Sequence, residues 1–389
     1  MKKTLKRVFK TTFLVQIMGI LIIPLIYLSF SENDFAAYGL FFSISAISSI
    51  FITGRLENLF FSIKNYKKLY TYAFNMALLV GGLGTLCLLF FNQSFYAICI
   101  FCGLSIGLFN LSYNYLVREN KEIYYNKVKI FRAILELLSV VAVCFFSLEI
   151  KILFLFISFS YFFTSLFVAF DINIFVKKYF FEGFLDFKYN FKYVLSDFFS
   201  SIFNSLYIYL PTIYFYFNGN ISNSANYFLI LKIFGVPTLM IAQSISTVIR
   251  QYAAEEFQKK NKITDTYSFF KSLYKKMLFP FLLLLSFTFL FFYLLDSFYI
   301  DGIFLYSVFL VFLVYVRAIY NTISSITYIF KWQHLNLKFQ ACLFFVSLLA
   351  LMLKFENIDS IHFYSLFSLF VYISYMYVLH KRIIQKGYL

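Results

Sequence analysis

Charged residues are scarce in this chain of 389 residues, at 13%, while hydrophobic residues make up 61% of it. Charged residues approach a quarter of a soluble domain, so the composition excludes an ordinary globular protein. Tryptophan occurs once and proline four times. Because a membrane-spanning helix needs about 20 mostly apolar residues, the length predicts roughly a dozen spans and leaves no room for a large soluble domain.

Motifs of enzymes and of ATP-driven pumps are missing as well. The sequence has no Walker motif, no DxD pair, no HExxH and no glycine-rich phosphate loop, which disfavours an ATP-driven pump and a metal-dependent glycosyltransferase. The five cysteines lie in apolar stretches and predict no disulfide framework. Cys99 and Cys102 have CxxC spacing without partner ligands nearby, so we expect no metal site. We predict no cofactor and no catalytic residue.

The net charge of +16 comes from short basic clusters between apolar runs. Such clusters indicate membrane topology, and we predict no nucleic-acid partner. The apolar runs predict twelve spanning helices. They lie at about residues 11–30, 35–54, 71–91, 94–116, 128–148, 152–176, 195–217, 226–249, 273–295, 303–330, 339–354 and 361–379.

The distribution of Lys and Arg supports this number of spans. With the N-terminus in the cytoplasm, nearly all basic residues fall in cytoplasmic segments, as the positive-inside rule requires. The exceptions are Lys151 and Lys354 in the other loops, and Lys232 and Arg317 inside spans. We therefore predict an all-α integral membrane protein with about twelve transmembrane helices and both termini in the cytoplasm.

The spans divide into two sets of six. We predict an N-terminal lobe at residues 1–180, a cytoplasmic linker at 181–194 and a C-terminal lobe at 195–389. Residues 35–44 at the start of the second span echo residues 224–233 at the start of the eighth. Because an even number of spans separates them, the repeat is parallel, about an axis along the membrane normal.

Ionisable groups within spans are costly in hydrocarbon, so they usually face a protein interior or a water-filled cavity. Arg317 lies near the middle of the tenth span, too deep to reach an interface easily. It is either a cation in a cavity or half of a structural ion pair. Lys232, about two turns from the outer end of the eighth span, either binds a substrate anion or reaches the head groups.

Three acidic residues are further candidates. Asp171 and Asp197 lie near cytoplasmic span ends, where a solvated carboxylate or a lysine partner is the simpler interpretation. Glu136 follows Arg132 by four residues, which places both on one helix face and favours a local ion pair.

Several segments resemble the polysaccharide and O-antigen flippases of the multidrug/oligosaccharidyl-lipid/polysaccharide (MOP) exporter superfamily. In the second span, Tyr38-Gly-Leu-Phe-Phe-Ser-Ile running to Gly54-Arg-Leu-Glu57 is similar to the family's glycine, arginine and acidic pattern, although Leu56 stands where the family often has an aromatic residue. Leu210-Pro-Thr and residues 225–232, 236–246 and 253–256 resemble the family's seventh and eighth helices in order and spacing.

The resemblance implies a MATE-like architecture with alternating access between two six-helix lobes. The substrate would be an undecaprenyl-diphosphate-linked oligosaccharide for O-antigen or capsule assembly. Arg317 and Lys232 would bind its diphosphate, since cations in a low-dielectric cavity bind phosphates strongly. Arg55 and Arg250, at cytoplasmic helix ends, would receive the incoming diphosphate or would simply follow the positive-inside rule.

The resemblance also implies a proton or sodium gradient as the energy source, with a coupling role for Asp197, Asp171 or Glu136. The protein would be a multi-pass protein of the bacterial cytoplasmic (inner) membrane, surrounded by membrane lipids. A polysaccharide polymerase and a chain-length regulator would be its partners.

Three alternatives stay open. An oligosaccharide polymerase or ligase usually needs a sizeable external loop, whereas the predicted external loops here are short. A small-molecule or drug exporter of the same superfamily would have the same fold. A major-facilitator transporter would carry a basic, glycine-rich signature between its second and third spans, and residues 55–68 lack it.

Overall fold

The computed structural model is helical, and none of the residues that it describes forms a strand. It describes residues 2–60, 63, 65–119, 121–171, 177–235, 303–324, 327, 329–330, 332–353 and 360–386, together with short stretches between 238 and 290. Helices suit a chain whose solvent is the bilayer, because a helix satisfies its backbone hydrogen bonds within itself.

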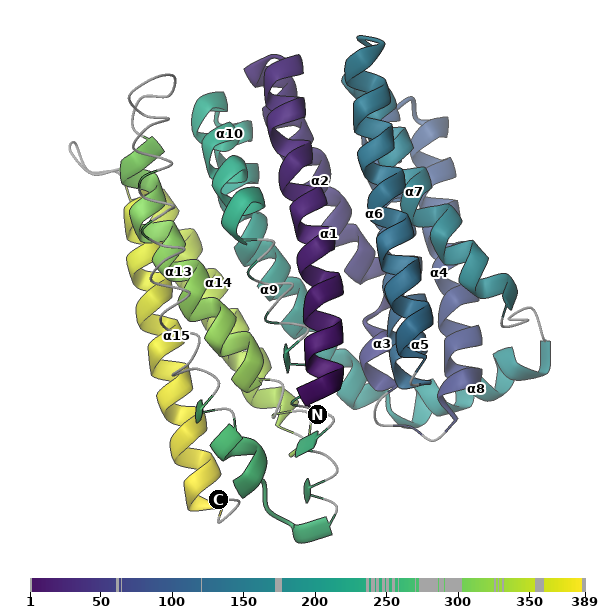
Figure 1. The fold of residues 1–389 in the computed structure, drawn as a ribbon, viewed down its shortest axis with the longest axis vertical. Coiled ribbons are helices and arrows are strands. Elements are labelled where there is room, and N and C mark those ends of the chain that lie inside the picture. Colours follow the sequence, from purple (N-terminus) through teal and green to yellow (C-terminus); the bar gives the residue numbers. More distant parts are fainter. Residues whose placement is uncertain are drawn as a thin grey trace. The chain divides into compact units, whose positions relative to one another are not determined.

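Residues Leu14–Ala225 form one compact unit, here called the N-terminal unit. Helix α5 packs against α2, α4 and α7 and so forms its centre. In Figure 1, α4 to α7 run side by side and α8 lies across the lower end of α4. The helices of this unit are α1 (Lys2–Ser29, from Leu14 on), α2 (Glu32–Thr53), α3 (Leu56–Leu59), α4 (Tyr66–Phe90), α5 (Ser94–Arg118), α6 (Glu122–Phe145), α7 (Ile150–Asp171), α8 (Lys177–Tyr189) and α9 (Phe191–Phe217).

Residues Met1–Phe13 and Asn226–Leu389 form the second compact unit, here called the C-terminal unit. Helix α15 packs against both α13 and α14. The ninth predicted span, at 273–295, lies almost entirely outside the described residues. The elements of this unit are most of α10 (Ile221–Ile230), the π-helical turn η1 (Leu231–Gly235), α13 (Ile303–Ser324), α14 (Gln333–Met352) and α15 (Ser360–Gln385).

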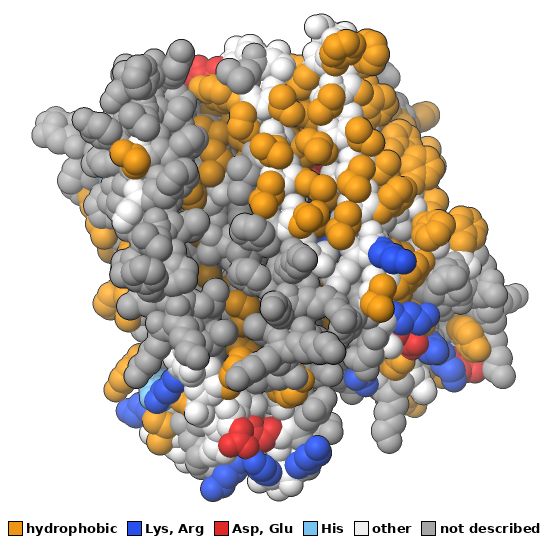
Figure 2. All heavy atoms as spheres, in the orientation of Figure 1, with side chains coloured by type: hydrophobic (Ala, Val, Ile, Leu, Met, Phe, Trp, Pro, Cys, Tyr) orange, Lys and Arg blue, Asp and Glu red, His pale blue; other side chains and the backbone are white. Residues whose placement is uncertain are grey.

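Among the described residues, six helices are long and apolar enough to cross a membrane: α2, α4, α5, α7, α14 and α15. Helix α6 has the length but carries Lys129, Arg132 and Glu136. It nevertheless exposes large apolar side chains such as Leu138 and Phe145. Figure 2 shows hydrophobic side chains covering much of one face of the N-terminal unit, with charged side chains at its lower edge. The protein is therefore a multi-pass membrane protein, while the number twelve and the side of both termini stay predictions.

Helices α2 and α5 approach each other closely at two glycines. A Cβ atom added to Gly103 would lie 2.9 Å from the carbonyl oxygen of Ser45, and one added to Gly107 would lie 2.6 Å from Cγ2 of Thr53. Glycines four residues apart are typical of tightly packed membrane helices, because van der Waals contact and not hydrophobicity drives their association. This crossing fixes the position of α2 within the unit.

The predicted linker at 181–194 is mostly helical, since it holds the greater part of α8 and the start of α9. The aromatic residues of α8 recur at helical spacing, and the ring of Tyr72 on α4 lies 5.3, 5.9 and 5.6 Å from those of Phe180, Phe184 and Phe187. Packing of one face against α4 therefore makes this segment a helix. The predicted lobe boundaries themselves stay a prediction.

Candidate functional site

Arg317 lies in α13 and is almost fully buried, with 4% of its surface exposed. Tyr320, one turn further along the same helix, is buried too, and residues three apart are neighbours on a helix surface. A guanidinium stays protonated in proteins. Helix α13 therefore holds a permanent positive charge inside the C-terminal unit.

Buried polar and aromatic side chains surround Tyr320. Its hydroxyl donates to Oδ1 of Asn336 at 2.6 Å and accepts from Nε2 of Gln340 at 2.8 Å, both on α14. Its ring lies 5.0 Å from that of Tyr372 and 5.4 Å from that of Tyr375, both on α15. The Tyr375 hydroxyl and Oε1 of Gln340 are buried without a hydrogen-bond partner among the described residues. Because buried polar groups are normally paired, these two atoms suit a water molecule or a polar ligand.

Lys232 lies in η1, directly after α10. Since α10 begins at Ile221, Lys232 is about three turns from the helix start; its predicted distance of about two turns from the outer end of the span stays a prediction. Its Nζ lies 5.4 Å from the ring centroid of Phe228. The turn packs against α13, so the elements that carry the two predicted cations, Lys232 and Arg317, are in contact. Single π-helical turns frequently mark functional sites.

Helix α6 carries a charged stripe inside the N-terminal unit. Nη1 of Arg132 lies 3.2 Å from Oε2 of Glu136, the pair expected from their spacing, and it also donates to the hydroxyl of Tyr161 on α7. Lys129, one turn earlier, places its Nζ 5.6 Å from the ring centroid of Tyr113 on α5. Since Lys129 and Arg132 are 7% and 9% exposed, the stripe holds two buried cations and one carboxylate.

The end of α2 brings Arg55 into a polar cluster. Gly54 ends the helix in the left-handed region at φ 58°, and Arg55 follows at φ 58°, a conformation that is uncommon for a residue with a side chain. Nη1 of Arg55 lies 3.1 Å from Oε1 of Glu57, whose side chain is 2% exposed. Nδ2 of Asn58 donates to Oδ2 of Asp197 on α9 at 2.7 Å. The short helix α3 thus links Arg55 to Asp197, which is buried and not solvated.

The side chains of two further predicted site residues lie outside the described part of the structure. Asp171 is the last residue of α7, and Arg250 lies outside the described residues.

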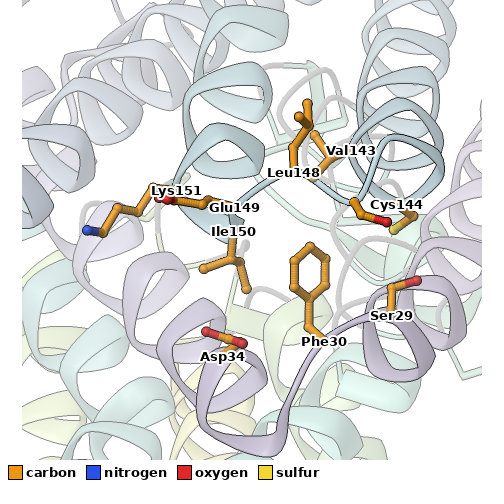
Figure 3. A pocket seen from close by; sticks show the side chains of 10 residues that line it. Ser29, Phe30, Asp34, Val143, Cys144, Leu148, Glu149, Ile150 and Lys151 are labelled. Carbon is orange, nitrogen blue, oxygen red and sulfur yellow. The ribbon is translucent and has the colours of Figure 1, made fainter.

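A cavity of about 430 Å³ lies in the N-terminal unit at the loops that precede α2 and α7. Its wall combines apolar Phe30 and Ile150 with the carboxylates of Asp34 and Glu149, and Phe30 points into its middle (Figure 3). None of the predicted site residues lines it. By the predicted topology it lies on the outer side of the membrane.

Sequence reasoning gave no role to Lys129, Glu57 or Asn58, all of which the structure places in polar clusters. Lys129 had a usable signal, because Lys129, Arg132 and Glu136 recur at helical spacing within one span. Asn58 had none, since its partner on α9 is 139 residues away in the sequence.

Comparisons with known proteins find similarity in structure only. No protein-family model matches the chain, and no curated protein sequence does. An outward-facing multidrug resistance MATE family transporter of the MOP superfamily matches with a TM-score of 0.71 and 12% identity, covering 99% of this chain and 96% of that one. A MOP superfamily transporter from Pyrococcus furiosus, described as having a binding pocket of reverse polarity that suggests a different function, gives 0.65 at 12% identity, with 98% and 96% covered.

A MATE transporter from Vibrio cholerae gives a TM-score of 0.64 at 12% identity, with 99% of this chain and 98% of that one covered. At identities this low, the structural similarity shows the fold alone and leaves the substrate open. The chain is therefore a multi-pass membrane protein with the fold of the MATE transporters of the MOP superfamily.

Proposed function

We propose that this protein is a flippase that moves undecaprenyl-diphosphate-linked oligosaccharides across the bacterial cytoplasmic membrane by alternating access. The observation that carries the proposal is the burial of Arg317, 4% exposed, on a helix that packs against the turn of Lys232. Cationic side chains within the spans of a membrane protein usually face its interior or a water-filled cavity and mark substrate pathways. Two cations on adjoining elements suit an anionic diphosphate head group, and a transporter of uncharged or cationic compounds has less use for this arrangement.

The diphosphate would bind at Arg317 and Lys232, whose elements contact each other, while the lipid tail stays in the bilayer. Arg55 and Arg250 would receive the head group on the cytoplasmic side. The hydroxyl and amide groups around Tyr320 are suited to the first sugar, since they offer both hydrogen bonds and aromatic rings.

A proton or sodium gradient would drive transport, and no cofactor is needed. Asp197, Asp171 and Glu136 are the candidates for coupling. Asp197 is the foremost of these, because it is buried and accepts a hydrogen bond from Asn58 beside Arg55. The translocated oligosaccharide would pass to a polysaccharide polymerase working with a chain-length regulator.

The test is translocation in reconstituted vesicles, with a short fluorescent undecaprenyl-diphosphate-linked oligosaccharide as substrate. Loss of a buried charge-assisted contact, worth about 1.5–3 kcal/mol, predicts a roughly 10- to 100-fold lower rate for Arg317→Ala. Arg317→Lys should retain part of the rate. Arg118→Ala is the matched control, because that arginine is exposed at a helix end, and it should transport like wild type.

Two outcomes would contradict the proposal. If wild type moves no lipid-linked glycan but membranes that contain it lengthen sugar chains, the protein is a polymerase or ligase. If wild type instead exports organic dyes and ignores the lipid, it is a small-molecule exporter. The buried aromatic group formed by Tyr320, Phe339, Tyr372 and Tyr375 is the feature that favours this second candidate, since aromatic side chains commonly line drug-sized sites.

A further inference from the structure

Helix α8 leaves a row of large apolar side chains uncovered. Phe181, Phe184 and Leu185 are 58%, 43% and 50% exposed. At 3.6 residues per turn, they fall within an arc of about 100° on the helix surface. Lys188 lies within the same arc and is exposed. This row is an apolar stripe that carries a basic residue; at its edge the ring of Phe184 lies 5.9 Å from that of Tyr72 on α4, while Phe181 and Leu185 stay at least half exposed.

The opposite face of α8 is fixed tightly against α4. A Cβ atom added to Gly183 would lie 2.7 Å from Cβ of Tyr72, so the two backbones approach as closely as glycine permits. Glu182 forms an ion pair with Lys68 of α4, and the ring of Phe187 lies 5.6 Å from that of Tyr72. The direction in which the row points is therefore set by the packing of α8 on α4.

The depth of α8 in the bilayer follows from its contacts with the first turns of α4. Helix α4 has 25 residues and is about 37 Å long, whereas the hydrocarbon core is about 30 Å thick. Roughly five residues of α4 therefore extend beyond the hydrocarbon core. We place them at its N-terminal end, because Lys67 and Lys68 there are charged. Because α8 contacts residues 68 and 72 and lies across the end of α4 (Figure 1), it sits at the boundary between head groups and acyl chains.

We propose that α8 is an in-plane helix that binds the bilayer leaflet beside it, with the row in the acyl-chain boundary and lysines on anionic phospholipid head groups. Amphipathic helices with an apolar face bind membranes in this way, and a lysine within that face can extend its charged end to the head groups. Lys188 and Lys192 are exposed, and Lys177 and Lys178 open the helix. The two acidic residues of α8, Glu182, which pairs with Lys68, and Asp186, both lie outside the arc and so do not face the head groups. This surface is independent of the transported substrate.

The single tryptophan of the chain makes the test direct. In a Trp332→Phe background, Phe181→Trp places a fluorophore in the row. Leu83→Trp, at a position 57% exposed in the middle of α4, reports mid-span depth, and Lys259→Trp reports an exposed polar segment. Each purified full-length variant is reconstituted in vesicles of phosphatidylcholine and phosphatidylglycerol whose acyl chains carry bromine at a shallow or a deep carbon.

We expect shallow bromine to quench the tryptophan at position 181 more than deep bromine, the reverse at position 83, and no bromine quenching at position 259. When only phosphatidylglycerol carries bromine, the tryptophan at position 181 should be quenched about twofold or more compared with vesicles in which the same fraction of phosphatidylcholine carries it. The reason is that a lysine near a membrane attracts anionic lipid. Lys188→Gln should reduce that excess.

Quenching at position 181 by aqueous iodide without quenching by bromolipid would overturn the proposal, because the row would then face water. Absence of quenching by either agent would also overturn it, because another protein or a second copy would cover the row. Equal quenching from both lipids would refute the preference for anionic head groups. Retention times in size-exclusion chromatography that match wild type exclude misfolded variants before the comparison.

Discussion

Replacing Gly103 by alanine tests the tight crossing of α2 and α5. The new Cβ atom would lie 2.9 Å from the carbonyl oxygen of Ser45 and against the hydroxyl of Ser48. The Ser48 hydroxyl can rotate, but the Ser45 oxygen belongs to the backbone of α2. Since ordinary contacts of this kind begin at 3.4 Å, the two helices must separate locally by roughly 0.5 Å.

The net effect is the difference of two opposing contributions. Inserting a methyl group into a packed interior costs about 1–3 kcal/mol. Alanine in a helix interior gains about 0.5–1 kcal/mol over glycine. We therefore expect Gly103→Ala to lower the free energy of unfolding by about 1 kcal/mol, within a range of roughly 0–2.5 kcal/mol.

Gly82→Ala in α4 is the matched control, because no atom lies within 4 Å of its added Cβ. It should raise the free energy of unfolding by up to about 1 kcal/mol. Both variants are measured by reversible unfolding in mixed micelles with increasing dodecyl sulfate, followed by circular dichroism. If Gly103→Ala proves as stable as Gly82→Ala, the close contact between α2 and α5 does not exist and the reasoning is refuted.

Three further predictions concern charged and polar contacts, each measured by the same titration. Glu136→Gln leaves Arg132 buried without its carboxylate and should cost about 3 kcal/mol of unfolding free energy. Replacing both Arg132 and Glu136 by methionine should cost less. If the loss in the double variant equals the sum of the losses in the two single variants, the pairing is contradicted. Asn58→Ala removes a donor to the buried aspartate of α9 and should cost about 1–3 kcal/mol, so an unchanged midpoint would count against that hydrogen bond. Burial raises the pKa of Glu256, but the side-chain hydrogen bond from Thr266 and the backbone hydrogen bonds from Asp265 and Thr266 outweigh it, and the net pKa is lowered. The stabilisation by Glu256 is present above the unfolded pKa of about 4.3 and is lost as the pH falls through the lowered pKa of the folded protein. Glu256→Gln should therefore destabilise the protein at pH 7 and leave its stability unchanged at a pH below the folded-state pKa.

The sequence predicted which segments form helices more accurately than it predicted the residues at which those helices begin and end. The second span was predicted at 35–54 and is observed as Glu32–Thr53, because a long apolar run is a strong signal. The fifth was predicted to begin at 128 and begins at Glu122. Hydropathy marks the part of a helix within hydrocarbon, whereas the helix itself continues among polar residues into the head-group region.

Contacts within one helix were also accessible from the sequence. The pair Arg132–Glu136 follows from a spacing of four residues, which fixes their separation once the segment is helical. The partner of Asn58 and the residues around Tyr320 depend on how separate helices pack, and hydrophobic patterns do not specify which faces meet. The roles of Arg317, Lys232, Arg55 and the candidate coupling residues stay predictions.

Composition and the lengths of the apolar runs by themselves determined that this chain is a helical membrane protein. The transfer of a segment out of water becomes favourable once it holds enough consecutive apolar residues to cross the bilayer. Tertiary structure alone decided which side chains meet. It placed the turn of Lys232 against the helix of Arg317, linked Arg55 to Asp197 through α3, and turned the linker into a helix with an uncovered apolar row. These features arise from packing between segments distant in the sequence, where shape and hydrogen bonding choose among many equally hydrophobic faces.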